Sequence, residues 1–281
     1  MLLQINVKCS IMEKVIFMEK IIEKIRQKKG FICDMDGVVY HGNELLPSAK
    51  KFVEWLRKEN KNFLFLTNSS ERSRLELRQK LQRMGLDVEE SHFYTSALAT
   101  ADFIKSQHPG ASVYCIGEAG LHNALYQAGI SMNDVNPDYV VIGETQNYNY
   151  QNIAKAVRLV MNGASLIGTN PDVTGPAEGG TIIPACRAMV APIELSTGKS
   201  AYFLGKPNPL MMRTGIKLLG CHSADTVIIG DRMDTDIIAG IQSAVDTVLV
   251  LTGVTTIEIM KQFPYRPTCV LNSVGEIPID Q

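Results

Sequence analysis

The chain has 281 residues, of which 45% are hydrophobic and 20% are charged, and its formal net charge is -1. This composition is typical of a folded globular protein and excludes an extensively disordered or fibrous chain. The near balance of acidic and basic residues gives no electrostatic reason to expect nucleic acid or an anionic membrane as a partner. No stretch approaches the roughly 18 apolar residues that cross a bilayer, so we expect no integral membrane contact.

The six cysteines are spread along the chain, and none of them forms a Cys-x-x-Cys pair. A chain of this size does not need disulfide bonds to hold its core, and structural zinc sites usually pair cysteines at that spacing. We therefore expect mostly buried thiols in a reducing compartment and predict a cytoplasmic protein.

Residues 1–29 form a basic segment that differs from the rest of the chain. Its apolar residues recur at steps of three and four, as on one face of an amphipathic helix (Ile11, Val15, Met18, Ile22 and Ile25). Lysines and glutamates interrupt every apolar run, which argues against a secretory signal. Three interpretations stay open: a helix packed on its own domain, a helix that binds a membrane surface or a partner, and an extension upstream of a start at Met12 or Met18.

From Gly30 onward, short apolar runs alternate with helical patterns. The runs predict strands buried on both faces, as in a parallel sheet: Phe31–Cys33, Phe63–Leu66, Thr226–Ile229 and Thr247–Leu251. Helices are predicted between them, at Ala49–Glu59, Ser73–Met84 and Pro209–Leu219. This alternation predicts an α/β fold with a doubly wound, Rossmann-like parallel sheet.

The middle of the chain repeats the α/β pattern independently. Strands are predicted at Val113–Ile116, Tyr139–Ile142 and Ser165–Ile167, and helices at Leu121–Ala128 and Ile153–Met161. We therefore predict an α/β domain at 97–197, inserted into a catalytic core made of residues 30–96 and 198–281.

Two acidic residues, Asp34 and Asp36, directly follow the first predicted strand and precede a glycine. Ligands of open parallel sheets bind beyond the carboxyl ends of the strands, where these side chains are expected to lie. Two carboxylates so close together repel each other unless a cation or a proton separates them. An isolated Asp-x-Asp is more often a solvated strand end, so the assignment needs support from other strands.

Three further strand ends supply that support. Thr67 and Asn68 follow the second strand, Lys206 follows an apolar run at 201–204, and Asp231 follows the strand Thr226–Ile229. Together they offer the hard oxygen ligands that suit magnesium, which usually shares its coordination shell with a phosphate. The Lys206 ammonium group would neutralise phosphate oxygens at the same edge.

These motifs resemble, in order, the four motifs of the haloacid dehalogenase-like (HAD) hydrolase superfamily: Asp34-x-Asp36-Gly37-Val38, Thr67-Asn68, Gly205-Lys206-Pro207, and Gly230-Asp231 followed by Thr235-Asp236. The similarity runs from about Phe31 to near the C-terminus. The chain is similar in particular to the NagD-type branch of sugar and nucleotide phosphatases, through Tyr94-Thr95-Ser96, Gly143-Glu144-Thr145 and Thr169-Asn170-Pro171-Asp172. The resemblance implies that the inserted domain is a cap.

The resemblance also assigns roles to individual residues. It implies that Asp34 is the nucleophile that forms an aspartyl-phosphate and that Asp36 is the general acid and base. Thr67 and Asn68 are implied to hold the phosphoryl group, and Lys206 to pair with both the nucleophile and the phosphate.

The magnesium site that the resemblance implies uses the Asp34 carboxylate, the main-chain carbonyl of Asp36 and Asp231. Asp236 is implied to bind through water or to anchor the ligands. The expected substrate is a small phosphorylated metabolite, either a nucleoside monophosphate such as UMP or a sugar phosphate. The oligomeric state stays open, and a homo-oligomer is possible.

Some features depart from the branch or bear on substrate choice. Ser69-Ser70 stands where many relatives carry a second Asn, and the segment Gly175–Thr181 is longer than in close relatives. Pro192 lies inside an expected cap helix and is predicted to bend or interrupt it. Polar candidates for substrate selection lie in or near the cap region: Asn170, Asp172 and Arg187.

Two alternatives come from other classes of protein. An aspartyl-phosphate signalling module also clusters Asp, Thr and Lys on a parallel sheet, but Asp36 supplies the acid and base of rapid turnover and argues against it. A non-catalytic phosphate-binding or scaffold protein would be expected to lack one of the catalytic groups, and none is missing here.

Overall fold

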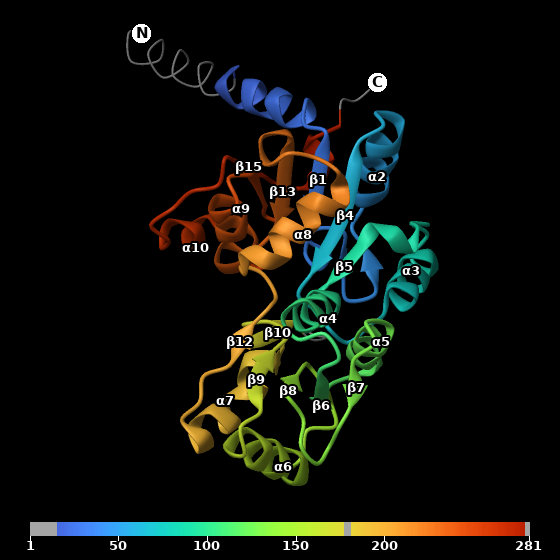
Figure 1. Ribbon diagram of the computed structural model, residues 1–281. Coiled ribbons are helices and arrows are strands. Elements are labelled where there is room, and N and C mark those ends of the chain that lie inside the picture. The colour runs from blue at the N-terminus through green and yellow to red at the C-terminus, as the bar shows by residue number, and fades with distance from the viewer. Residues whose placement is uncertain (1–15, 177–180, 279–281) are drawn as a thin grey trace. The chain divides into compact units, whose positions relative to one another are not determined.

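The computed structural model describes residues 16–176 and 181–278 (Figure 1). The chain divides into two compact units, one made of Met1–His41, Leu45–Phe63 and Ile216–Gln281, the other of Gly42–Glu44 and Leu64–Gly215. The expected boundaries of the inserted domain, 97–197, stay a prediction. Among the described residues, no helix combines the length and apolar character that crossing a bilayer requires.

The main sheet has six strands in the order β15-β14-β13-β1-β4-β5. Their bounds are β1 (Gly30–Cys33), β4 (Asn62–Thr67), β5 (Phe93–Thr95), β13 (Thr226–Gly230), β14 (Asp246–Val250) and β15 (Cys269–Leu271). In the first unit, β1 pairs in parallel with β13, β13 with β14, and β14 with β15. The four strands predicted in the core are confirmed, and so is the parallel α/β fold.

The first unit buries its central strand completely. All four residues of β1 are buried, and the Phe31 ring meets Phe52 and Trp55 of helix α2 (Ala49–Lys58) edge-on at 6.3 and 5.5 Å between ring centroids. Strands buried on both faces read as uninterrupted apolar runs, which is why the sequence pattern identified this sheet. Further helices of the chain are α8 (Pro209–Leu219), α9 (Ile238–Gln242) and α10 (Ile257–Lys261).

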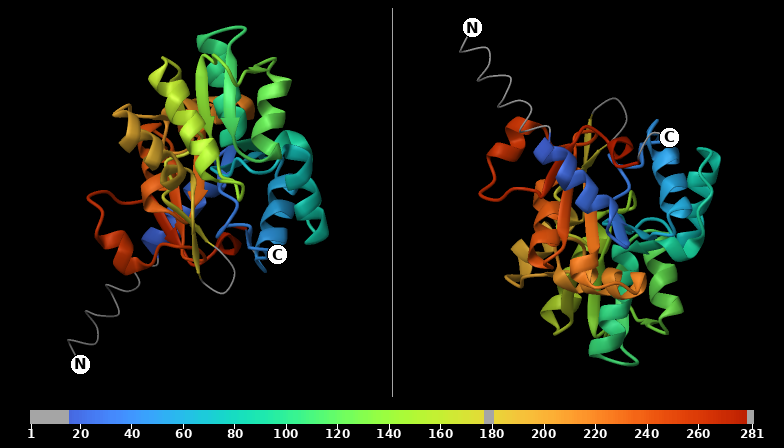
Figure 2. Two further views of the ribbon diagram at one scale, coloured as in Figure 1. Left: turned by 90° about the horizontal axis from the view of Figure 1, so that it is seen from below. Right: turned by 90° about the horizontal axis from the view of Figure 1, so that it is seen from above.

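The amphipathic segment is helical at residues 16–26 and packs on the first unit. Ile22 and Ile25 of its predicted apolar face are buried, while Ile11 and Val15 lie outside the described residues. The Arg26 Nε donates to the Ile277 carbonyl at 2.7 Å, and the Met18 and Cys269 sulfurs lie 3.7 Å apart. Figure 2 shows this helix in blue, beside the red C-terminal segments. For these residues, the interpretation as a helix on its own domain is the one that the structure shows.

The second unit contains a separate five-stranded parallel sheet in the order β12-β9-β8-β6-β7. The strands are β6 (Ser112–Ile116), β7 (Ser131–Met132), β8 (Tyr139–Ile142), β9 (Ser165–Gly168) and β12 (Tyr202–Phe203). Its helices are α3 (Arg74–Arg83), α4 (Ser96–Gln107), α5 (Ala119–Gln127), α6 (Tyr150–Met161) and α7 (Cys186–Thr197). The predicted second α/β sheet of the cap is thus confirmed.

One apolar core joins this sheet to helices α6 and α7, which lie beside each other in Figure 1. Val140 and Ile142 of β8 point into it from the sheet, with Leu159 of α6 and Val190 of α7 opposite them. A short antiparallel hairpin, β10 (Thr174–Pro176) and β11 (Ile182–Pro184), precedes α7. Residues 177–180 of the segment Gly175–Thr181 lie outside the described residues.

Pro192 was predicted to bend or interrupt a cap helix, and the structure shows that it does not interrupt one. Helix α7 continues through Pro192 and ends at Thr197, where Gly198 takes a left-handed conformation with φ of 66°. Proline lacks an N–H and crowds the carbonyl four residues earlier. The buried side chains Met189, Val190 and Ile193 flank Pro192, so the packing of this face outweighs the lost hydrogen bond.

Candidate active site

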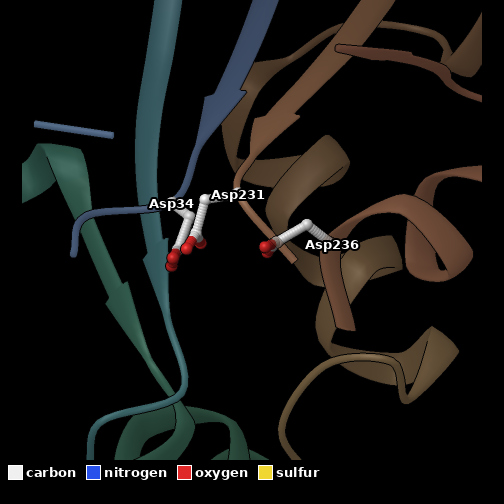
Figure 3. A group of neighbouring side chains, drawn as sticks. All are labelled: Asp34, Asp231 and Asp236. Atoms are coloured by element: carbon white, nitrogen blue, oxygen red, sulfur yellow. The ribbon is translucent and has the colours of Figure 1, made fainter. Parts of the chain in front are cut away.

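The carboxyl ends of β1 and β13 bring two acidic residues together. The strands pair in parallel with Cys33 opposite Ile229, so Asp34 and Asp231 follow the two strand ends. The Asp34 N–H continues the ladder and donates to the Ile229 carbonyl at 2.9 Å. Figure 3 shows the two carboxylates side by side and pointing the same way.

Asp236 completes a group of three carboxylates. It lies in the short π-helix η4 (Met233–Ile237), directly after β13, and its side chain points toward the other two in Figure 3. Each residue offers an oxygen within 4.8 Å of the others. Asp231 is 2% exposed and Asp236 is fully buried. The structure therefore places Asp236 within the acidic cluster itself.

Main-chain donors orient the two buried carboxylates. The Val254 N–H donates to Asp231 Oδ2 at 2.7 Å, and the Arg232 N–H donates to Asp236 Oδ2 at 3.2 Å. Three carboxylates at this spacing repel one another unless a cation is bound between them. Two ligands of one Mg²⁺ are at most about 4.2 Å apart, so small side-chain movements would bring this hard oxygen set to the spacing that Mg²⁺ requires.

Three glycines pack closely against these carboxylates. A Cβ on Gly253 would lie 2.0 Å from Asp231 Oδ2, one on Gly37 would lie 2.7 Å from the same oxygen, and one on Gly230 would lie 2.2 Å from the Asp236 Cβ. Gly37 also has a φ of +77°, which favours glycine. The loop at 252–254, which the sequence analysis did not single out, thus forms part of the wall around Asp231.

Asp36 contributes no side-chain oxygen to the cluster of three carboxylates. Its side chain is 43% exposed, and its Oδ1 lies 3.6 Å from the Nδ1 of His41. The other ring nitrogen of His41 is bonded to the Thr252 carbonyl. Asp36 is therefore an accessible carboxyl group beside an imidazole, which suits exchange of protons with a bound molecule.

In the second unit, the Asn68 side chain fixes the main chain of Lys206. Asn68 Oδ1 accepts from the Lys206 N–H at 2.7 Å, and Asn68 Nδ2 donates to the Lys206 carbonyl at 3.0 Å. The Lys206 side chain is 2% exposed, and its Nζ donates to the Leu66 carbonyl at 2.9 Å. Thr67 is also buried and accepts from the Ser69 N–H at 3.1 Å. The second unit thus holds Thr67, Asn68 and Lys206 close together at the end of β4.

Two of the polar candidates for substrate selection contact Asn68. Asn170 Nδ2 donates to the Asn68 carbonyl at 2.7 Å, and Asn68 Nδ2 donates to Asp172 Oδ2 at 3.0 Å. The third, Arg187, lies with its guanidinium over the Phe203 ring and 3.3 Å from a Glu194 oxygen. Asn170 and Asp172 thus support the phosphate-binding candidates, whereas Arg187 packs within the cap.

Glu144 follows β8. It belongs to the motif Gly143-Glu144-Thr145, from which no role was predicted for it. One of its carboxylate oxygens accepts a hydrogen bond from Asn170 Nδ2, and the other accepts one from the Ser70 hydroxyl. The Ser70 N–H also donates to the second oxygen, at 3.3 Å. Burial raises the pKa of the Glu144 carboxyl, while these hydrogen bonds act in the opposite direction.

Comparison with known proteins identifies the family. Residues 31–131 match the family described as haloacid dehalogenase-like hydrolase, and residues 203–277 match a HAD-hydrolase-like family. Dihydroxyacetone phosphatase of Corynebacterium glutamicum is 43% identical over 247 residues, which cover 88% of this chain and 90% of that protein. The chain belongs to the haloacid dehalogenase-like hydrolase family.

Two further relatives place the chain within the NagD-type branch of the HAD family. The ribonucleotide monophosphatase NagD of Escherichia coli is 41% identical over 251 residues, with 89% of this chain and 98% of that protein covered. Its solved structure gives a TM-score of 0.83 over 90% of this chain and 99% of that chain. An acid sugar phosphatase of Staphylococcus aureus is 39% identical over 253 residues, with 90% and 97% covered. The predicted family, branch and phosphatase class are confirmed.

Proposed function

We propose that the protein is a magnesium-dependent phosphomonoester hydrolase that works through an aspartyl-phosphate on Asp34. The cluster of Asp34, Asp231 and Asp236 carries this proposal, because three carboxylates so close together favour a bound cation, and one of them is the candidate nucleophile. The donor set is all oxygen, as Mg²⁺ prefers.

The first chemical step is attack of an Asp34 carboxylate oxygen on phosphorus. A bond forms between this oxygen and phosphorus, and the bond from phosphorus to the ester oxygen breaks. Asp36 donates its proton to the departing oxygen, so an alcohol leaves and an acyl phosphate remains on Asp34. The exposed position of the Asp36 side chain allows it to reach the leaving group.

The second step returns the enzyme to its starting state. Asp36, now a carboxylate, takes a proton from a water molecule whose oxygen attacks phosphorus. The bond from phosphorus to the Asp34 oxygen breaks, and inorganic phosphate leaves. Asp36 therefore serves first as acid and then as base. The covalent intermediate on Asp34 is what divides one difficult displacement into two easier steps.

The other site residues bind and orient the phosphate. Lys206 offers a buried ammonium group to the phosphate oxygens, and Thr67 and Asn68 offer a hydroxyl and an amide. Asp231, together with Asp34 and the main-chain carbonyl of Asp36, would hold Mg²⁺. Asp236 lies close enough to bind it through a water molecule or to anchor the other ligands. When bound, Mg²⁺ would neutralise negative charge that develops on the phosphoryl oxygens.

The proposed substrates are small phosphorylated metabolites, either nucleoside monophosphates such as UMP or sugar phosphates. The relatives support both classes, since they are named as a ribonucleotide monophosphatase, an acid sugar phosphatase and a dihydroxyacetone phosphatase. The cap supplies the contacts that select between such esters.

Phosphate release from a panel of nucleoside monophosphates, sugar phosphates and p-nitrophenyl phosphate, with and without Mg²⁺, tests the proposal. We expect turnover by the wild-type enzyme that depends on Mg²⁺, and a loss of about 10³-fold or more in Asp34→Asn. Folded enzyme that releases phosphate equally well in excess chelator, or that keeps its rate in Asp34→Asn, would refute it. The preferred ester decides between the substrate classes.

A further inference from the structure

Lys206, the proposed phosphate-binding cation, depends on Asn68 for its position. Both polar atoms of the Asn68 side chain form hydrogen bonds with the main chain of Lys206, at 2.7 and 3.0 Å. A shift of Asn68 would therefore displace the main chain from which the ammonium group extends. This matters because a misplacement of about 1 Å can reduce a rate by about 10²-fold.

Asn68 is in turn fixed by contacts to its carbonyl oxygen. Asn170 Nδ2 donates to it at 2.7 Å, and the Ser96 hydroxyl donates to it as well. The orientation of the Asn170 amide is set by its oxygen, which accepts from the Asp172 N–H at 3.1 Å. The amino group of Asn170 therefore faces Asn68.

Glu144 connects Asn170, which holds the Asn68 carbonyl, with Ser70 in the segment that follows Asn68. Its two carboxylate oxygens bind Asn170 and Ser70, as described above. The Thr169 hydroxyl donates to the Ser70 oxygen at 3.2 Å, which directs the Ser70 proton toward Glu144. The Asn170 amide, the Ser70 hydroxyl and the Ser70 N–H are thus all donors to this side chain, and a carboxylate is the acceptor that suits all three.

We propose that Glu144 is a positioning residue for the reaction, which holds residues 68–70 so that Asn68 keeps Lys206 in place to bind phosphate. This inference rests on the proposed function, in which Lys206 binds phosphate. It assigns no contact between Glu144 and the substrate. The observation that carries it is the continuous set of hydrogen bonds from Glu144 through Asn170 and Asn68 to Lys206.

Glu144→Gln is the sharpest test, because glutamine keeps the shape and brings an amino group where only acceptors fit. The amino group would face either Asn170 Nδ2 or the donors of Ser70, so one hydrogen bond is lost. We expect kcat for p-nitrophenyl phosphate to fall on the order of 10- to 100-fold. The inhibition constant of inorganic phosphate should rise about tenfold, since phosphate reports on Lys206.

Glu118→Gln is the matched control. Glu118 also lies at the carboxyl end of a cap strand and accepts from a hydroxyl and an N–H, at 2.6 Å from Thr145 and 3.2 Å from Gln146. Within the described residues, no hydrogen bond joins the Glu118 side chain to residues 68–70. We therefore expect the phosphate inhibition constant to stay at the wild-type value. Thermal unfolding of each variant shows whether it is folded at the assay temperature.

A double variant tests whether Glu144 acts on Asn68 through Asn170. Asn170→Ala should weaken phosphate inhibition, and adding Glu144→Gln to it should weaken inhibition by less than the product of the two single effects. Should Glu144→Gln fail to fold, Ser70→Ala removes one donor from Glu144, and we expect a loss in the same direction but smaller.

The outcomes separate the two claims. A wild-type enzyme that hydrolyses no phosphomonoester defeats the proposed function. If the wild-type enzyme is active while folded Glu144→Gln keeps its kcat and phosphate inhibition constant, only the role of Glu144 fails. Equal losses in Glu118→Gln, or fully multiplicative effects in the double variant, would likewise overturn it.

Discussion

At the scale of single residues, the geometry of the acidic cluster depends on the glycines packed against it as well as on its three carboxylates. Gly253 shows this best, because a Cβ there would lie 2.0 Å from Asp231 Oδ2 and 2.4 Å from the Asp231 Cβ. The next residue, Val254, donates its N–H to the same carboxylate. The loop that orients Asp231 therefore approaches it too closely for any side chain.

Gly253→Ala should weaken magnesium binding without removing a ligand. The added methyl group must push Asp231 or the 252–254 loop away, and disturbing a group that orients a metal ligand typically lowers affinity by about 10- to 100-fold. We expect the Mg²⁺ concentration that gives half-maximal phosphate release to rise by at least about tenfold. Titration of activity with Mg²⁺ measures this directly.

Gly175→Ala provides the comparison, since among the described residues its Cβ would meet only the Ile183 Cγ1, at an ordinary 3.8 Å. Its Mg²⁺ dependence should match that of the wild type. An unchanged Mg²⁺ requirement in folded Gly253→Ala would show that Asp231 does not need this close packing.

At the scale of elements, charged contacts fasten the helix at 16–26 and the turn after it to β14. Asp246 begins that strand and lies 2.9 Å from Lys24 Nζ and 2.5 Å from Lys28 Nζ. Partial burial raises the pKa of the Asp246 carboxyl, but hydrogen bonds and charges from Lys28 and Lys24 lower it by more, so its pKa is below the ordinary value. The carboxylate form is thus favoured by folding.

Asp246→Asn should lower the free energy of unfolding by about 1–3 kcal/mol at pH 7, because it removes charged hydrogen bonds that are partly shielded from water. A carboxyl group whose pKa is lowered by folding contributes stability above its unfolded pKa of about 4, and this is lost as the pH falls through the folded pKa. The difference from wild type should therefore shrink as the pH falls below about 4. Urea unfolding at pH 7 and at a series of lower pH values measures it.

The control for Asp246→Asn is Asp225→Asn. Asp225 lies 3.8 Å from Lys29, and both side chains are well exposed, so the loss should stay below about 1 kcal/mol. A loss in Asp246→Asn that is no larger, or that persists unchanged at low pH, would contradict the account of how the helix is held.

Also at this scale, the apolar runs that became β1, β4, β13 and β14 could be predicted from the sequence, because strands buried on both faces leave an uninterrupted apolar pattern. The same reasoning predicted the clustering of Asp34 and Asp231, since the ends of parallel strands meet at one edge. That α7 continues through Pro192 could not be predicted, because local propensity does not register the packing of this helix on its sheet.

Gly253 and Glu144 could not be assigned roles in this way. Gly253 contacts a residue 22 positions earlier through a loop with no periodic pattern. Glu144 gains its partners from two segments distant in sequence, around Ser70 and Asn170. Contacts between distant loops depend on tertiary structure, which a pattern along the chain does not encode.

At the scale of the whole molecule, similarity to HAD phosphatases covers about nine-tenths of the chain. The family and the phosphatase class follow from this similarity. The proposed roles of Asp34 and Asp36 depend in addition on formation of an aspartyl-phosphate on Asp34. Asp36 offers a way to isolate that step. p-Nitrophenolate leaves without the help of an acid, but release of phosphate from Asp34 still needs a base.

Rapid acid quench of Asp36→Asn during reaction with ³²P-labelled p-nitrophenyl phosphate in the presence of Mg²⁺ tests this claim most directly. We expect a burst of p-nitrophenolate that approaches one per enzyme, and alkali-labile label on the peptide that contains Asp34. Asp34→Asn should show neither. Label on another residue, or steady phosphate release by Asp34→Asn at the wild-type rate, would contradict the proposed mechanism.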